Sequence, residues 1–224
     1  MWALTNVARS RWPEERLILA HRLDRDTSGV ILVARSSDAD RHLKNMFQRQ
    51  YVVKRYVALV HGTPEWDTIL IDAPIHDDEA SLIRVKMGVH PDGMKARTRI
   101  FVLARFEDFS LVAALPQTGR THQIRLHLSH VGHPILGDRI YGQPEQTFIH
   151  IFEEGYDQEI HAKVGMERHA LHAQRLNIVS PNEGPIEVQA KIPARMRRII
   201  RAGSFAAARA QEGLEGASRL APPQ

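Results

Sequence analysis

Three short segments of this 224-residue chain collect polar and charged side chains where a helix or strand would favour apolar ones. They run over residues 21–29 (HRLDRDTSG), 54–62 (KRYVALVHG) and 118–127 (TGRTHQIRLH). The first holds two carboxylates, Asp24 and Asp26, and such a pair could serve a glycosidase as acid and nucleophile. With only 6% aromatic residues, the chain offers little surface for stacking a sugar, so this interpretation is the weaker one. We expect Asp26 to cap or brace its loop.

The third segment opens a run of histidines. His122, His127, His130 and His133 lie within twelve residues, and some of them could share one face of a helix. Their spacing matches neither a His-Glu-x-x-His pattern nor a tetrahedral ligand set, and the chain has no cysteine. The sequence therefore predicts packing and substrate contact for these histidines, and no metal site.

Most of the remaining pattern is typical of strands. A helix is expected after Ser36 or Ser37, because either can cap it and the following apolar residues have helical spacing. Many strands in hairpin order with few helices predict an α+β fold on a mixed, mainly antiparallel sheet. The expected strands cover 52–60, 68–72, 82–86, 96–103, 110–115, 171–179 and 186–190, with turns at 90–93 and 181–184, a helix over 121–131, a basic helix opening at Pro193 and a frayed tail from Gly203.

Composition excludes several classes of protein. Hydrophobic residues make up 43% and charged residues 25%, which is the ordinary globular balance. The apolar runs are far shorter than the roughly 18 residues of a membrane-spanning helix, and the N-terminal residues do not resemble a secretory signal. Without cysteine, a disulfide framework and a cysteine nucleophile are ruled out. We expect a cytoplasmic protein with no membrane partner.

Charge is concentrated near the C-terminus. The formal net charge is +4, and residues 191–224 hold seven basic residues against two acidic ones. Such a segment suits a polyanionic partner, because lysine and arginine release condensed counterions from phosphates. A solvated helix face explains the same charges, and on charge alone it is the better explanation.

In order and spacing, the three polar segments resemble the signature of the RluA-type pseudouridine synthases, and the later Leu171-His172-Ala173 is similar to a further element of that family. The resemblance runs from about residue 19 to residue 188. It implies an isomerase without metal or cofactor that acts on uridine in rRNA or tRNA, with no DNA partner. The base is detached from its ribose at nitrogen, turned, and rejoined through carbon.

The resemblance assigns roles by position in the motifs. Asp24 would be the catalytic aspartate, Tyr56 the tyrosine packed against uracil, and Arg125 the arginine paired with Asp24. Burial beside a base disfavours a charged carboxylate, so a permanent cation is needed, and a guanidinium can grip a carboxylate with two parallel hydrogen bonds. Tyr56 shares a strand face with Lys54, which argues against an ordinary core tyrosine. Its phenol could also remove the carbon-bound proton after rejoining.

RNA contacts follow from the need to extrude the target nucleotide from its stack. Arg22 could enter the vacated stack or hold a phosphate, and the helix after residue 120 would favour anions at its start. His172 is expected to be a packed histidine. The residues predicted to contact RNA are His21, Arg22, Lys54, Arg120 and His122.

The expected domain organisation has three parts: a truncated lead-in over 1–20, a pseudouridine synthase catalytic domain over 21–192, and a basic helix with a flexible tail over 193–224. Family members usually carry a strand and a lysine-proline-glycine loop before the aspartate motif, and this sequence contains no such loop. A missing strand would expose a sheet edge and lower stability. Two alternatives remain: a catalytically silent RNA-binding remnant, and a metal-dependent hydrolase that uses the histidines.

Overall fold

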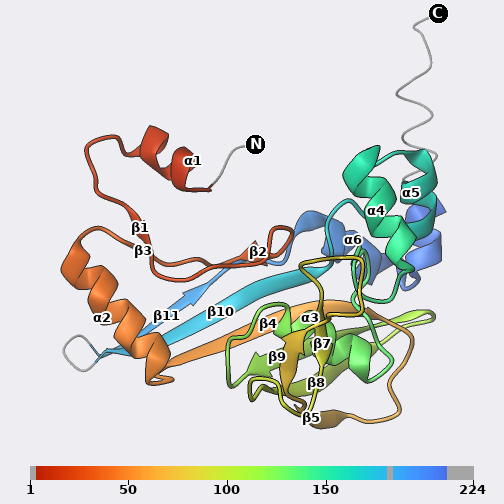
Figure 1. The fold of residues 1–224 in the computed structure, drawn as a ribbon, viewed down its shortest axis with the longest axis horizontal. Helices are drawn as coiled ribbons and strands as arrows, with labels where there is room; N and C mark the ends of the chain where they lie inside the picture. Colours follow the sequence, from red (N-terminus) through yellow and green to blue (C-terminus); the bar gives the residue numbers. More distant parts are fainter. Residues whose placement is uncertain (1–3, 181–183, 211–224) are drawn as a thin grey trace, which may run out of the picture.

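The computed structural model describes residues 4–180 and 184–210 (Figure 1). No helix in these ranges is long and apolar enough to cross a membrane. The helices are α1 Leu4–Arg11, α2 Ser37–Gln48, α3 Gln123–His130, α4 Glu145–Glu153, α5 Gln158–Val164 and α6 Ala194–Ala202. The strands are β1 Ile18–Leu19, β2 Ser28–Gly29, β3 Val33–Ala34, β4 Val52–His61, β5 Thr68–Asp72, β6 Ile75–Asp77, β7 Met87–Val89, β8 Arg97–Arg105, β9 Phe109–Pro116, β10 Leu171–Ser180 and β11 Gly184–Gln189.

One seven-stranded sheet organises the molecule. Its order is β11-β10-β4-β9-β8-β5, with every neighbouring pair antiparallel, and the short strand β2 pairs with β10 in parallel. The long strands β4 and β10 run from α2 at one end of the molecule towards α4, α5 and α6 at the other (Figure 1). The predicted α+β fold on a mixed, mainly antiparallel sheet is confirmed.

The central strand β4 anchors the main core. Its residues 57–60 are almost fully buried, because β9 and β10 flank the strand and helices cover the sheet. Met196 and Ile199 of α6 belong to the same buried cluster, as does Phe205. Residues 205–210 are helical, so the frayed tail predicted from Gly203 is wrong for this stretch, and the remainder of that tail lies outside the described residues. The C-terminal helices therefore pack as part of the same core.

Most predicted elements are confirmed within a few residues. Ser36 caps α2 by accepting a hydrogen bond from the Ala39 N–H, as its position indicated. The expected strand over 82–86 is wrong: this stretch is a turn, and the strand is β7, immediately after it. The Glu145 carboxylate explains the difference, because it accepts hydrogen bonds from the Ser81 hydroxyl and the Leu82 N–H and thereby holds the loop away from a ladder. Helices α4 and α5 were not predicted.

Candidate active site

Asp24 and Arg125 meet across 101 positions of sequence. A guanidinium N–H of Arg125 donates to Asp24 Oδ2 at 3.2 Å. The Arg125 side chain is 6% exposed, whereas 21% of the Asp24 side chain remains open to solvent. The pair therefore combines a carboxylate that a substrate can reach with a buried permanent cation.

The stronger partner of Arg125 is Asp138, which the sequence analysis did not identify. Nε and a terminal nitrogen of Arg125 donate to the two oxygens of Asp138 at 2.6 and 2.8 Å. The expected pair of parallel hydrogen bonds therefore exists, but on Asp138 and not on Asp24. Asp138 Oδ1 also accepts from the N–H groups of Ile140 and Tyr141. No sequence signal marks Asp138, because its neighbours Gly137 and Arg139 are typical of a surface turn, and its full burial appears only in the structure.

Opposite charges hold this pair ionised in spite of burial. Burial alone would raise the pKa of Asp138, but the hydrogen bonds and charge of Arg125 outweigh it and leave that pKa below its ordinary value. Burial likewise works against the charge on Arg125, yet hydrogen bonding and attraction from Asp138, with a smaller contribution from Asp24, raise its pKa. The guanidinium is thus a fixed cation beside Asp24.

Helix α3 carries Arg125 and is fastened to β8 by two polar side chains. Gln123 donates to Thr98 Oγ1 at 2.9 Å, and His127 Nδ1 lies 2.8 Å from the same oxygen. His127 Nε2 also lies 2.9 Å from the Ala73 carbonyl oxygen. Because these side chains are almost fully buried and satisfied, they fix the helix and with it the direction of Arg125.

The loop that carries Asp24 is fastened to the start of β10. Thr27 Oγ1 lies 2.8 Å from His169 Nε2, and Ser28 Oγ lies 2.8 Å from His172 Nδ1. Gly29 has φ 118°, and a Cβ there would lie 2.1 Å from the Ala173 carbonyl oxygen. Only glycine fits such a close approach, so β2 can pair with β10 only with this residue. His172 is packed, as predicted.

Tyr56 lies on β4 between β10 and β9. Its cross-strand neighbours are Ala173 and Ala114, and its ring packs against the main buried cluster. Burial, and then the charge of Asp24, raises the pKa of Tyr56 to about 12. The phenol is therefore protonated at neutral pH and lies within electrostatic reach of Asp24.

Two residues predicted to contact RNA are engaged within the fold. His21 Nε2 accepts from the Leu32 N–H at 3.0 Å, its ring centroid lies 4.9 Å from that of Phe47, and burial lowers its pKa. Lys54 Nζ donates to the Thr118 carbonyl oxygen at 3.1 Å, and burial lowers its pKa as well. Both side chains support the loops around the site, and their RNA contacts stay predictions.

The other three lie at the rim of the site. Arg22 and Arg120 are exposed, and Arg120 Nε donates to the Lys95 carbonyl oxygen at 3.2 Å. His122 adopts the left-handed conformation with φ 55°, so α3 begins at Gln123 and not at 121 as predicted. Burial, and next the charge of Arg125, lowers the pKa of His122 to about 4. A strained, neutral imidazole at the cavity wall is typical of a functional site.

The clustered histidines diverge in space. His122 Nδ1 lies 3.1 Å from the Tyr141 hydroxyl, His127 faces β8, and His133 Nδ1 lies 2.9 Å from the His61 carbonyl oxygen. In the part of the chain that the structure describes, no three His, Asp or Glu side chains are placed to hold a metal ion.

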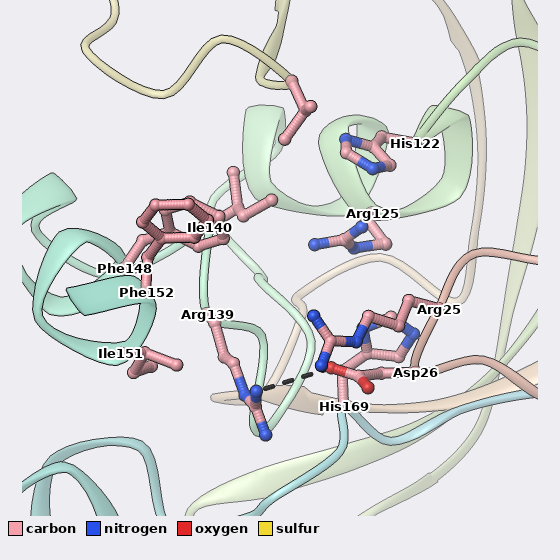
Figure 2. A pocket seen from close by; sticks show the side chains of 11 residues that line it. Arg25, Asp26, His122, Arg125, Arg139, Ile140, Phe148, Ile151, Phe152 and His169 are labelled. Atoms are coloured by element: carbon pink, nitrogen blue, oxygen red, sulfur yellow. Dashed lines mark ion pairs between the residues drawn. The ribbon is translucent and has the colours of Figure 1, made fainter. Parts of the chain in front are cut away.

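A cavity of about 370 Å³ opens beside Arg125. Figure 2 shows Arg125 pointing into it from α3, with Arg25, Asp26 and His169 on the facing loops. Asp26 Oδ2 lies 3.9 Å from Arg139 Nε, shown as a dashed line in Figure 2. Asp26 thus braces its loop, as expected.

Comparison with known proteins shows which family the chain is similar to. The RNA pseudouridylate synthase family matches residues 5–130. An uncharacterized RNA pseudouridine synthase of Chloroflexus aurantiacus is 40% identical over 205 residues, which cover 88% of this chain and 59% of that protein. Ribosomal large subunit pseudouridine synthase C of Vibrio cholerae is 38% identical over 190 residues, covering 84% of this chain and 56% of that protein. The chain thus spans a little more than half the length of these relatives.

A solved structure extends the comparison to the fold. Human RNA pseudouridylate synthase domain containing 1 superposes with a TM-score of 0.69 at 28% identity, covering 84% of this chain and 74% of that one. The resemblance seen in the three polar segments is confirmed, and the chain belongs to the RNA pseudouridylate synthase family, among its RluA-type members.

Proposed function

We propose that this chain isomerises uridine in RNA to pseudouridine, with Asp24 as the catalytic carboxylate. The contact between Arg125 and Asp24 carries the proposal, because it combines a partly exposed carboxylate with a buried cation at the edge of a cavity. Family membership supplies the reaction class. The chemistry requires no net oxidation: the bond from ribose C1′ to uracil N1 breaks, a bond from C1′ to C5 forms, the proton leaves C5, and N1 gains a proton.

Asp24 acts at the sugar. Breaking the glycosidic bond develops positive charge at C1′, which an ionised carboxylate can neutralise or capture. Arg125 keeps that carboxylate in place with a single hydrogen bond. Asp138 in turn holds Arg125 through two hydrogen bonds, so the cation does not follow Asp24 during the reaction.

Tyr56 acts on the base. Its ring gives the extruded uracil a face for stacking. Its hydroxyl passes its own proton to uracil N1, and the resulting phenolate oxygen takes the C5 proton after the new bond has formed, so Tyr56 ends the reaction protonated as it began. The charge of Asp24 is one of the causes of the raised pKa of Tyr56, after burial, and that charge is absent while the carboxylate is bonded to C1′.

The relatives named for the large ribosomal subunit make its RNA the first substrate to test, with tRNA as the second. Protein-free transcripts of both would be incubated with the purified chain, and pseudouridines mapped by carbodiimide modification and primer extension. We expect new pseudouridines with the wild-type chain and none with Asp24→Asn. Asp72→Asn, a change in an exposed ion pair on β5, is the matched control and should keep full conversion.

Conversion that survives in Asp24→Asn would refute the role of Asp24. RNA binding by a folded wild-type chain without any new pseudouridine would refute the proposed activity and support the silent RNA-binding alternative. Folding would be checked by circular dichroism in every case.

A further inference from the structure

The cavity beside Arg125 has a second wall that the proposed reaction does not use. Phe148, Ile151 and Phe152 of α4 line it, opposite Arg125 (Figure 2). These positions are three and four apart, so they share one face of the helix. The Phe152 side chain is 82% exposed, which is the largest exposure among the large hydrophobic residues that the structure describes. An aromatic ring left open on the wall of a functional cavity offers a platform for a ligand.

The platform is fixed in position. Glu145, in the first turn of α4, accepts hydrogen bonds from the Ser81 hydroxyl at 2.6 Å, the Leu82 N–H at 3.1 Å and Lys86 Nζ at 2.7 Å. Phe148 itself packs against a buried cluster that contains Tyr141. Helix α4 and Phe148 are therefore held before any ligand arrives, and the exposed Phe152 side chain is the part left to be ordered on binding.

Three arginines, Arg25, Arg125 and Arg139, line the cavity. Arg125 is paired with Asp138 and Asp24, and Arg139 with Asp26, which leaves Arg25 as the lining arginine without an ion pair among the described residues. A terminal nitrogen of Arg139 also donates to the Glu167 carbonyl oxygen, and its buried Nε makes no hydrogen bond within the described residues. Arginines beside a stacking surface match a nucleotide, which brings a phosphate and a flat base together.

We propose that the α4 wall binds the base of a nucleotide next to the target uridine, stacked on Phe152 with its phosphate towards Arg25 and Arg139. This inference rests on the proposed function. The occupant differs from the target uracil, because neither Asp24 nor Tyr56 is among the residues that line this cavity. Stacking on an aromatic side chain tolerates any base, so Phe152 contributes to affinity and placement of the strand, not to the choice of uridine.

The test measures RNA affinity separately from chemistry. Binding of a fluorescent large-subunit RNA fragment would be followed by anisotropy for Asp24→Asn and for Asp24→Asn with Phe152→Ala. Stacking contributes about 1–3 kcal/mol per base, so we expect Kd to rise about 5- to 150-fold. Phe152→Trp should keep the affinity, and Phe152→Leu, which is apolar but has no ring, should lose it. Tyr51→Ala is the control, because Tyr51 is also exposed but lies outside the cavity.

In the active chain, Phe152→Ala should raise KM by a similar factor and leave kcat within a few-fold. An unchanged Kd and KM in a folded Phe152→Ala protein would overturn the inference while the proposed function stood. If Phe152→Leu bound RNA as tightly as the wild-type side chain, apolar contact and not stacking would explain the affinity, and the inference would be overturned as well. If Phe152→Ala changed the oligomeric state but not the RNA affinity, the α4 wall would bind a second copy of the chain, and the inference would be overturned. Absence of all RNA binding would overturn both proposals, whereas binding without conversion would overturn only the proposed activity.

Discussion

Asp138→Asn tests whether the buried pair with Arg125 holds the site together. The Asp138 side chain is fully buried and that of Arg125 is 6% exposed, so the substitution leaves a buried guanidinium without its principal counter-charge. Removing one partner of a buried ion pair typically costs about 3–5 kcal/mol. Asp24 remains 3.2 Å from Arg125 and supplies part of the lost charge, which places the expected loss near the lower end, about 3 kcal/mol.

The assay is thermal unfolding followed by circular dichroism at pH 7. For a chain of this size, a loss of about 3 kcal/mol corresponds to a fall in Tm of roughly 6–12 °C. Pseudouridine formation should fall as well, because Arg125 is free to turn and take both oxygens of Asp24. Asp72→Asn removes an exposed partner of Arg97 and should leave the unfolding midpoint unchanged.

Acid sensitivity supplies a second measurement on the same variant. The pKa of Asp138 is depressed below its ordinary 3.8 in the folded state, so its contribution to stability is complete above that value and is lost as pH falls through the lower folded pKa. Asp138→Asn should therefore flatten the stability curve below about pH 4. The reasoning would be refuted if Asp138→Asn kept both the wild-type unfolding midpoint at pH 7 and the wild-type loss of stability below about pH 4.

Three further predictions concern the elements around the site. Gly29→Ala should lose more than about 2 kcal/mol of stability in thermal unfolding, because its Cβ would collide with the Ala173 carbonyl oxygen. Gly132→Ala, which is also at positive φ but in open space, should lose only about 1 kcal/mol. Tyr56→Phe should lower kcat by about 10²- to 10⁴-fold with RNA affinity retained, and full turnover would leave Tyr56 with stacking alone. Burial lowers the pKa of His169 from 6.5 to about 4, so the unfolded chain binds the extra proton between these values and stability should fall as pH drops through this window. His169→Gln should reduce that slope in urea titrations, the rest of it coming from other buried histidines such as His122, and an unchanged slope would contradict the prediction.

Local pattern was enough for most of the fold. Runs rich in apolar residues marked β4, β5, β8, β9 and β10. Strand β8 alternates because one of its faces is covered and the other is open, whereas β9 is apolar along most of its length because both of its faces are covered. The pattern failed at residues 82–86, where Leu82 and Val85 suggested a strand but are both exposed. Glu145 determines the path of that loop from about sixty positions downstream, and an ion-paired anchor of this kind leaves no periodic signal nearby.

The site was predicted in part. The motifs led to Asp24 and Arg125, and the structure brings the two together. They did not lead to Asp138, because a Gly-Asp pair in a loop looks like an ordinary turn until its burial is known. The bonds from Thr27 to His169 and from Ser28 to His172 were also missed. Each joins residues more than 140 positions apart, and neither side chain alone shows that it has a partner.

The division of hydrogen bonds among the carboxylates explains which of them can react. Asp138 accepts four hydrogen bonds and is fully buried, so its oxygens are occupied and closed to a substrate. The Asp26 carboxylate faces Arg139, and this contact braces the loop that carries Asp26. Among the described residues, only Arg125 donates a hydrogen bond to the Asp24 carboxylate, and it reaches a single oxygen. Asp24 thus lies against one cation and still has an oxygen to offer the sugar, and this combination is available because Asp138 takes the other two hydrogen bonds of Arg125.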